Sequence, residues 1–144
     1  MSGLAGLLAG RKDTGIYRWH GAFGVNDVRH TVEHAGWHFA YYDGWGGESS
    51  EEFLAGIDKA LGLPEDHAHK FDDLADDLAD VVAGDSKGTV LLWDGWGPFA
   101  RADEQAFSVA LSVLGTRVNA ERGGPFAVLL RGEGPEVAGV ASLD

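Results

Sequence analysis

Four short apolar stretches along the chain are typical of β-strands. Residues 16–19 alternate between apolar and polar side chains, and residues 37–42 form a compact aromatic run. Residues 89–93 are almost entirely apolar, which is typical of a strand covered on both faces. Residues 126–130 form the last apolar stretch. We therefore expect four strands.

Between these stretches, apolar residues recur at the three- and four-residue spacing of amphipathic helices. The pattern predicts four helices: one capped by Asn26 and ended by Gly36, one from Ser49 or Ser50 to Gly62, one from Lys70 to about Ala83, and one capped by Asp103 and running to about Ala120. Long helical connections between apolar strands imply parallel pairing. The sequence thus predicts a single α/β domain, a small parallel sheet covered by helices, with a loose tail after Arg131.

Length and composition limit the class of protein. A chain of 144 residues, 44% of them hydrophobic, can bury a core as one domain. The absence of cysteine excludes disulfides, thiolate metal sites and a cysteine nucleophile. Residues 1–10 lack the basic start and the long apolar run of a signal peptide, and no stretch approaches the roughly 20 apolar residues of a membrane span. We therefore expect a cytoplasmic protein.

The charge of the chain indicates what kind of partner it has. Asp and Glu number 23 against 11 Lys and Arg, for a formal net charge of −12. Such a surface repels nucleic acid and anionic membranes and favours a cationic partner. The alternative interpretation is an acidic surface that serves solubility alone.

Common enzyme and metal motifs are absent from the sequence. The glycine-rich segment 44–47 has no lysine for a phosphate-binding loop, and neither a Gly-x-Ser-x-Gly elbow nor a His-Glu-x-x-His pair occurs. His30 and His34 stand four residues apart, but no third metal ligand is evident. His67 and His69 are an equally weak metal signal. We expect no cofactor and no metal.

A tetrapeptide, Asp-Gly-Trp-Gly, occurs twice, at residues 43–46 and 94–97, each time after an expected strand. The repeat could be a duplicated site or two similar turns at strand ends. We favour the two turns.

The predicted helix that starts at Lys70 carries five aspartates: Asp72, Asp73, Asp76, Asp77 and Asp80. At about 100° per residue, Asp72, Asp76 and Asp80 lie along one ridge, and the other two lie beside it. The apolar residues of this helix, Phe71, Leu74, Leu78 and Val82, are expected on the opposite side. Like charges four residues apart repel one another and destabilise a helix. We expect Asp72, Asp73, Asp76 and Asp80 to be exposed for partner binding, the alternative being a merely solvated acidic face.

These residues resemble the barstar family. Leu63-Pro64-Glu65 followed by residues 71–76 matches, in register, that family's Leu-Pro-Glu and Leu-Asp-Ala-Leu-x-Asp segments. Residues 90–93 resemble its second strand, which also ends in tryptophan. The resemblance covers residues 37–131, so that residues 1–36 are expected to be an added strand-helix unit and residues 132–144 a tail.

The sequence departs from the family pattern around the helix. His67-Ala68-His69-Lys70 stands where the family has an aromatic-Gly-x-Asn stretch. Asp66 and Ala75 replace two aromatic residues of the family's interface, and Val118 lies near the position of a glutamate on its last helix.

The resemblance implies a bacterial, antitoxin-like inhibitor rather than an enzyme, which binds a basic, secreted, guanyl-specific ribonuclease in a 1:1 complex and is a monomer when free. It implies phosphate mimicry, in which Asp76 fills the phosphate site of the nuclease beside Asp72. The remaining acids would steer the nuclease. The partner surface implied by the resemblance comprises Asp72, Asp76, Asp73, Asp80, Asp66, His67 and Ala75.

Two other functions stay open at this point. The same fold could bind another basic toxin or protein partner. Alternatively, paired carboxylates could serve a hydrolase, with or without a metal. A hydrolase requires carboxylates in a deep pocket, whereas an inhibitor requires a flat or convex acidic face.

Overall fold

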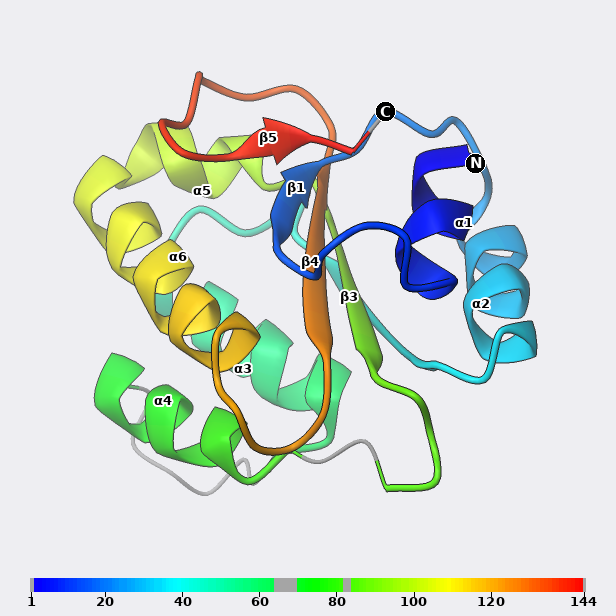
Figure 1. Ribbon diagram of the computed structural model, residues 1–144. Coiled ribbons are helices and arrows are strands. Elements are labelled where there is room, and N and C mark those ends of the chain that lie inside the picture. Colours follow the sequence, from blue (N-terminus) through cyan, green and yellow to red (C-terminus); the bar gives the residue numbers. More distant parts are fainter. Residues whose placement is uncertain (1, 64–69, 82–83, 144) are drawn as a thin grey trace.

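The computed structural model describes residues 2–63, 70–81 and 84–143 as one α/β sandwich around a five-stranded parallel sheet (Figure 1). The strand order is β2-β3-β4-β1-β5. The strands are β1 (Ile16–Arg18), β2 (His38–Asp43), β3 (Thr89–Asp94), β4 (Phe126–Arg131) and β5 (Ala141–Ser142). The helices are α1 (Ser2–Leu8), α2 (Val25–His34), α3 (Ser50–Leu61), α4 (Phe71–Ala79), α5 (Gly97–Ala102) and α6 (Glu104–Val118). The predicted α/β class and parallel pairing are confirmed.

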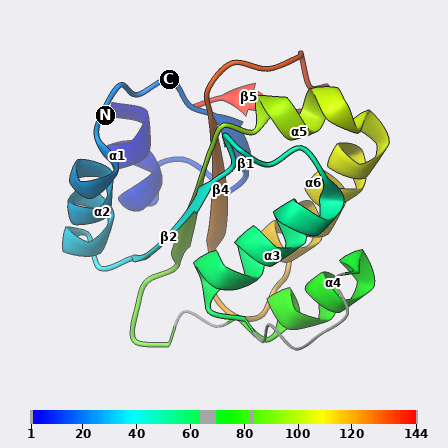
Figure 2. The same cartoon turned by 180° about the vertical axis from the view of Figure 1, so that it is seen from behind.

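Side chains of the central strands alternate between two cores, one on each face of the sheet. Leu91 and Val128, which are partners in the register, join the core beneath α3 to α6. Val90 and Ala127, one residue earlier on each strand, join the core beneath α1 and α2. Figures 1 and 2 show these two layers of helices on opposite sides of the sheet. The apolar run of β3 is therefore explained by burial on both faces.

Of the five residues predicted to cap or end helices, Gly36, Ser49, Gly62 and Asp103 do so. The Ser49 side chain accepts a hydrogen bond from the Glu52 amide at 3.1 Å, and Asp103 accepts one from Ala106 at 3.0 Å. Gly62 ends α3 with φ of +67°, the left-handed conformation that favours glycine. The predicted cap at Asn26 is wrong, because α2 begins earlier, after Gly24, without a side-chain cap.

Two helices were not predicted. α1 has Leu4 and Leu7 fully buried, but its glycines interrupt the apolar periodicity, so its stability comes from packing on the sheet. α5 begins at Gly97-Pro98. This pair is typical of a turn, but proline is also well suited to the first turn of a helix.

Both ends of the chain are built into the sheet. β1 pairs with β4, and β5 pairs with β1, so both strands extend the sheet, and α1 and α2 cover one of its faces. The prediction of a loose tail is wrong. Leu143 is only 1% exposed, its amide donates to the Arg18 carbonyl at 2.9 Å, and its carbonyl accepts from Lys12 Nζ at 2.9 Å.

The repeated tetrapeptide forms two turns side by side, since Asp43 and Asp94 are partners in the register of β2 and β3. The tryptophans of the two turns differ in burial. Trp96 is fully buried, whereas Trp45 is 56% exposed and its ring lies over Gly95. A Cβ atom at Gly95 would lie 2.5 Å from that ring, and φ there is +69°. The two copies are thus structural turns with unlike tryptophans, not equivalent halves of one site.

Arg131 of β4 links the loop after β1 to β3 through hydrogen bonds. Its Nε and Nη2 donate to the two carboxylate oxygens of Asp94 at 2.6 and 2.8 Å. Its Nη1 donates to the carbonyls of Gly21 and Phe23 at 3.1 and 2.7 Å. The hydrogen bond to Asp94 raises the pKa of Arg131. Burial, together with Asp94, raises the pKa of the neighbouring Tyr41 to about 12.

Replacement of Arg131 by methionine should destabilise the fold. The substitution leaves the Asp94 carboxylate, whose side chain is 9% exposed, without its cation and removes two bonds to the loop after β1. Because the pair is partly exposed, we expect a loss of about 2–4 kcal/mol in the free energy of unfolding, below the range for a fully buried pair. Urea denaturation measures this, with Arg101→Met on the exposed side of α5 as the control. Equal stability of the two variants would contradict the role given to Arg131.

Candidate functional site

The acidic helix α4 is fixed to the molecule by one apolar side. Leu74 and Leu78 are buried, and the ring of Phe71 lies 6.1 Å from that of Phe53 on α3. The helix packs against α6 and α3 at one end of the helical layer (Figures 1 and 2). Lys70 precedes it without a side-chain cap. Packing therefore holds α4 in place and determines which of its residues face outward.

Three of the predicted aspartates form an exposed row. Asp72, Asp76 and Asp80 are exposed, as predicted, whereas Asp73 at the edge of the row is half-buried. Within the part of the chain that the structure describes, the carboxylates of Asp72, Asp76 and Asp80 make no hydrogen bond or ion pair. From Asp72 to Asp80 the row spans eight residue steps, or about 12 Å at 1.5 Å per step. It offers three unneutralised carboxylates to an approaching cationic surface.

Asp77 does not belong to this row, and the prediction that placed it beside the ridge is wrong. Its side chain is 8% exposed. At about 100° per residue, Asp77 lies about 60° from Leu74 and 100° from Leu78, so that it falls within the buried arc of the helix. The core therefore covers a wider part of α4 than the apolar residues alone indicate.

The helix is also shorter than predicted. The expectation was a helix from Lys70 to about Ala83, but α4 ends at Ala79, and the Asp80 amide already donates to the Asp77 carbonyl at 3.1 Å. Residues 82 and 83 lie outside the described residues.

The end of α4 is held by Arg117 of α6, a residue that sequence reasoning missed. Arg117 is 3% exposed, and its Nη2 donates to the Val81 carbonyl at 2.9 Å while Nη1 donates to the Gly124 carbonyl at 3.2 Å. Its guanidinium lies 4.9 Å from the Phe126 ring, and burial lowers its pKa. A cation at this position is favourable because carbonyl groups at a helix C-terminus carry partial negative charge. The signal was available: Arg117 continues the buried stripe of α6 formed by Phe107, Ala110 and Leu114.

The other predicted site residues are placed only in part. Ala75 is partly buried and lies on the flank of the acidic row next to Asp72. Asp66 and His67 lie outside the described residues. His30 and His34 are exposed on α2 with stacked rings 5.8 Å apart. Among the described residues, no three His, Cys, Asp or Glu side chains gather closely enough to hold a metal ion.

The geometry suits recognition of a cationic surface. Carboxylates on an exposed helix can reach guanidinium and ammonium groups of another molecule and accept charge-assisted hydrogen bonds from them. Nothing in the described part of the chain competes with a partner for Asp72, Asp76 or Asp80. In the described residues, no helix is long and apolar enough to cross a membrane.

A comparison with protein-family models identifies residues 37–131, which begin at Trp37 and end with β4. The matching model is described as Barstar (barnase inhibitor). The match covers well over half of the chain and includes α4 together with Arg117 of α6. No curated protein matches the chain.

Two neighbouring aspartates of α4 should affect stability in opposite directions. Asp76→Ala removes a like charge one turn from Asp72 and from Asp80, and alanine is a better helix former than aspartate. We therefore expect the free energy of unfolding to rise by about 0.2–1 kcal/mol. Asp77→Ala truncates a buried side chain, so we expect a loss of about 1–3 kcal/mol. Thermal melting of both variants beside the wild type measures the difference. A large loss of stability in Asp76→Ala would show that Asp76 has a structural role.

Proposed function

We propose, from the premise that the chain belongs to the barstar family, that it is an intracellular protein inhibitor of a basic ribonuclease and not an enzyme. In this proposal the acidic helix α4 enters the active site of the nuclease in a 1:1 complex. The chain itself is a monomer when free. The partner in this proposal is a secreted, guanyl-specific ribonuclease, the class that the sequence resemblance implies.

The mechanism that we propose is mimicry of the RNA phosphate. A ribonuclease holds the phosphate of its substrate with cationic side chains, and a carboxylate can accept the same charge-assisted hydrogen bonds. Asp76 lies at the centre of the exposed row and would occupy the phosphate site, with Asp72 one turn before it. Asp80 and the half-buried Asp73 would add to the electrostatic attraction. Asp66 and His67, in the segment that precedes α4, would contact the nuclease beside this helix.

The single observation that carries this proposal is the exposed, unneutralised row on α4. A hydrolase that uses paired carboxylates needs them in a pocket that excludes water around the substrate. Asp72, Asp76 and Asp80 are instead exposed. They belong to α4 and its C-cap, and α4 lies at the edge of the molecule (Figure 2). The exposed row therefore favours an inhibitor over an enzyme.

A second candidate is a basic partner other than the ribonuclease named in the family description. Ala75 supports it, since this small side chain stands beside Asp72 where the family resemblance places an aromatic residue. Loss of an aromatic anchor lowers the affinity for a partner surface shaped to receive it. A different basic toxin with a flatter surface would fit the same acidic row.

The principal test is inhibition by Asp76→Ala. If Asp76 occupies the phosphate site, its loss leaves cationic groups of the nuclease buried without a partner, which typically costs about 2–5 kcal/mol and acts mainly on the dissociation rate. We therefore expect Asp76→Ala to inhibit about 30-fold to several thousand-fold more weakly than the wild type. Inhibition assays and surface plasmon resonance with barnase and other basic guanyl-specific ribonucleases measure this.

Glu33→Ala is the matched control, because it removes the same charge from an exposed site on α2, across the sheet from α4. It should weaken binding only slightly, through reduced electrostatic steering. Asp77→Ala cannot serve as this control, because Asp77 is buried. If Asp76→Ala inhibits the nuclease as well as Glu33→Ala does, Asp76 does not mimic the phosphate.

Salt should slow association. A net charge of −12 attracts a basic protein over distances that exceed direct contact, and ions screen this attraction beyond about 8 Å at physiological ionic strength. We expect the association rate constant to fall by at least about tenfold between 10 mM and 500 mM NaCl, with a smaller change in the dissociation rate. Stopped-flow measurements across this range provide the test. An association rate that does not change with salt would contradict electrostatic steering.

A further inference from the structure

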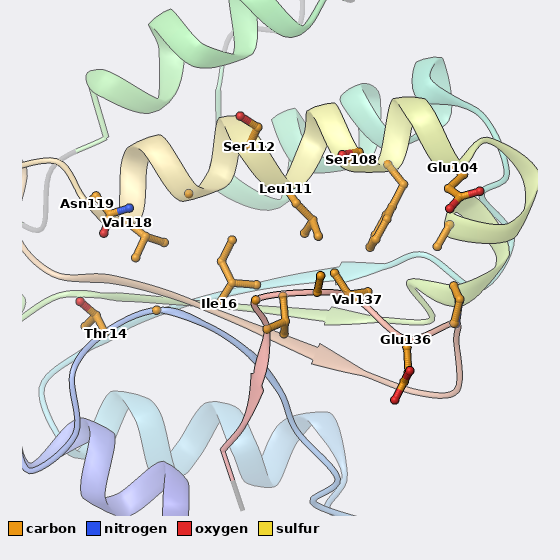
Figure 3. Close-up of a pocket in the computed structure, with 18 residues that line it drawn as sticks. Thr14, Ile16, Glu104, Ser108, Leu111, Ser112, Val118, Asn119, Glu136 and Val137 are labelled. Atoms are coloured by element: carbon orange, nitrogen blue, oxygen red, sulfur yellow. The ribbon is translucent and has the colours of Figure 1, made fainter.

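A second region of the molecule has the form of a binding site. A pocket of about 610 Å³ lies between α6 and the segment Pro135–Val140, with Ile16 of β1 at its floor (Figure 3). Leu111 points into it from α6 and faces Val137 on the opposite wall. This volume lies within the range of sites that hold small organic molecules.

The pocket exists because of segments outside the family match. Residues 14–16 and 135–140 supply its floor and one wall, and both lie beyond residues 37–131. The wall formed by α6, with Ala100 of α5 and Asn119, belongs to the matched region. At about 100° per residue, Leu111 and Gly115, which line the pocket, lie about 120–160° around α6 from Arg117, which bonds to the chain just after α4. The pocket is thus separate from the acidic row.

Gly115 keeps the pocket open. It lies in the interior of α6, where glycine destabilises a helix relative to alanine. Its φ is not in the left-handed region, and a Cβ atom there would meet only Ile16 Cδ1, at an ordinary 3.9 Å. No turn or close backbone contact therefore requires glycine at this position. A larger side chain would instead project into the cavity.

The charges around the pocket indicate the kind of ligand. Glu104 and Glu136 lie at the same end of the cavity (Figure 3). The described lining residues include no Lys, Arg or His. The middle of the cavity is apolar, with Ile16, Leu111 and Val137. A molecule with an apolar body and one cationic end matches this arrangement, whereas a carboxylate or phosphate would meet two like charges.

We propose that this pocket binds a small amphiphilic amine, with its apolar part between α6 and the segment 135–140 and its ammonium group near Glu104 and Glu136. The apolar part gains free energy by leaving water, and the ammonium stays at the solvent-exposed end beside the carboxylates. The proposal is independent of nuclease inhibition, because the acidic row lies on α4 and no residue of α4 lines the pocket.

n-Octylammonium chloride is the probe, with sodium octanoate and 1-octanol as matched controls of the same chain length. Each is titrated into ¹⁵N-labelled full-length protein at pH 7, where the amine is protonated. We expect octylammonium to shift amide signals of α6 and residues 135–140 saturably and to bind at least about fivefold more tightly than octanoate. Failure of octylammonium to bind, or equal binding of octanoate, would overturn the proposal.

Gly115→Leu tests the location. The leucine fills the cavity without a close contact at its Cβ and is a better helix former, so the variant should fold at least as stably as the wild type. We expect it to bind octylammonium at least about tenfold more weakly. Gly115→Ala is the control and should bind nearly as the wild type does. Glu104→Gln combined with Glu136→Gln should reduce the preference for octylammonium over 1-octanol. Unchanged binding by a folded Gly115→Leu protein would overturn the assignment of the pocket.

Discussion

The fold depends on burial of the central strands on both faces. β3 and β4 carry apolar side chains in both directions, so each face of the sheet needs a cover. Helices α3 to α6 cover one face, and α1 and α2 cover the other (Figure 1). Because α1 and α2 precede residue 37, where the family match begins, residues 2–36 complete the core of this protein instead of merely preceding it. Arg131 forms an ion pair with Asp94 and bonds to the loop after β1. These bonds hold the first part of the chain against the sheet.

The same requirement determines which side of α4 is exposed. Leu74, Leu78 and the buried part of Asp77 hold the helix against its neighbours, and Arg117 holds the chain just beyond its end. The opposite side of the helix is exposed to solvent, and the carboxylates on it repel one another. A row of this kind does not stabilise the free protein. It becomes favourable when cationic groups of another molecule approach, which is why we connect it with binding.

Apolar periodicity predicted the four principal strands and four of the helices. Ser49, Gly62 and Asp103 correctly indicated helix ends. Both kinds of signal depend only on a few neighbouring residues, which is why the sequence reveals them. Features set by distant contacts were missed. α1 forms on the sheet despite its glycines, and β5 is held by pairing with β1. The exposed row of Asp72, Asp76 and Asp80 followed from helical geometry alone. The burial of Arg117 could have been predicted from the stripe of α6. The burial of Asp77 and the bond from Arg117 to Val81 depend on how α4 meets α6, which a single sequence does not specify.

The most direct test is to map the surface that barnase covers. Amide signals of ¹⁵N-labelled protein, recorded with and without unlabelled barnase, report which residues change environment on binding. The account predicts that the largest changes lie in residues 70–81 and in the part of α6 that packs on α4, with α1, α2 and the pocket beside Gly115 nearly unchanged. Changes centred on α1 and α2, or on the edge of the sheet at Trp45, with α4 unaffected, would contradict it.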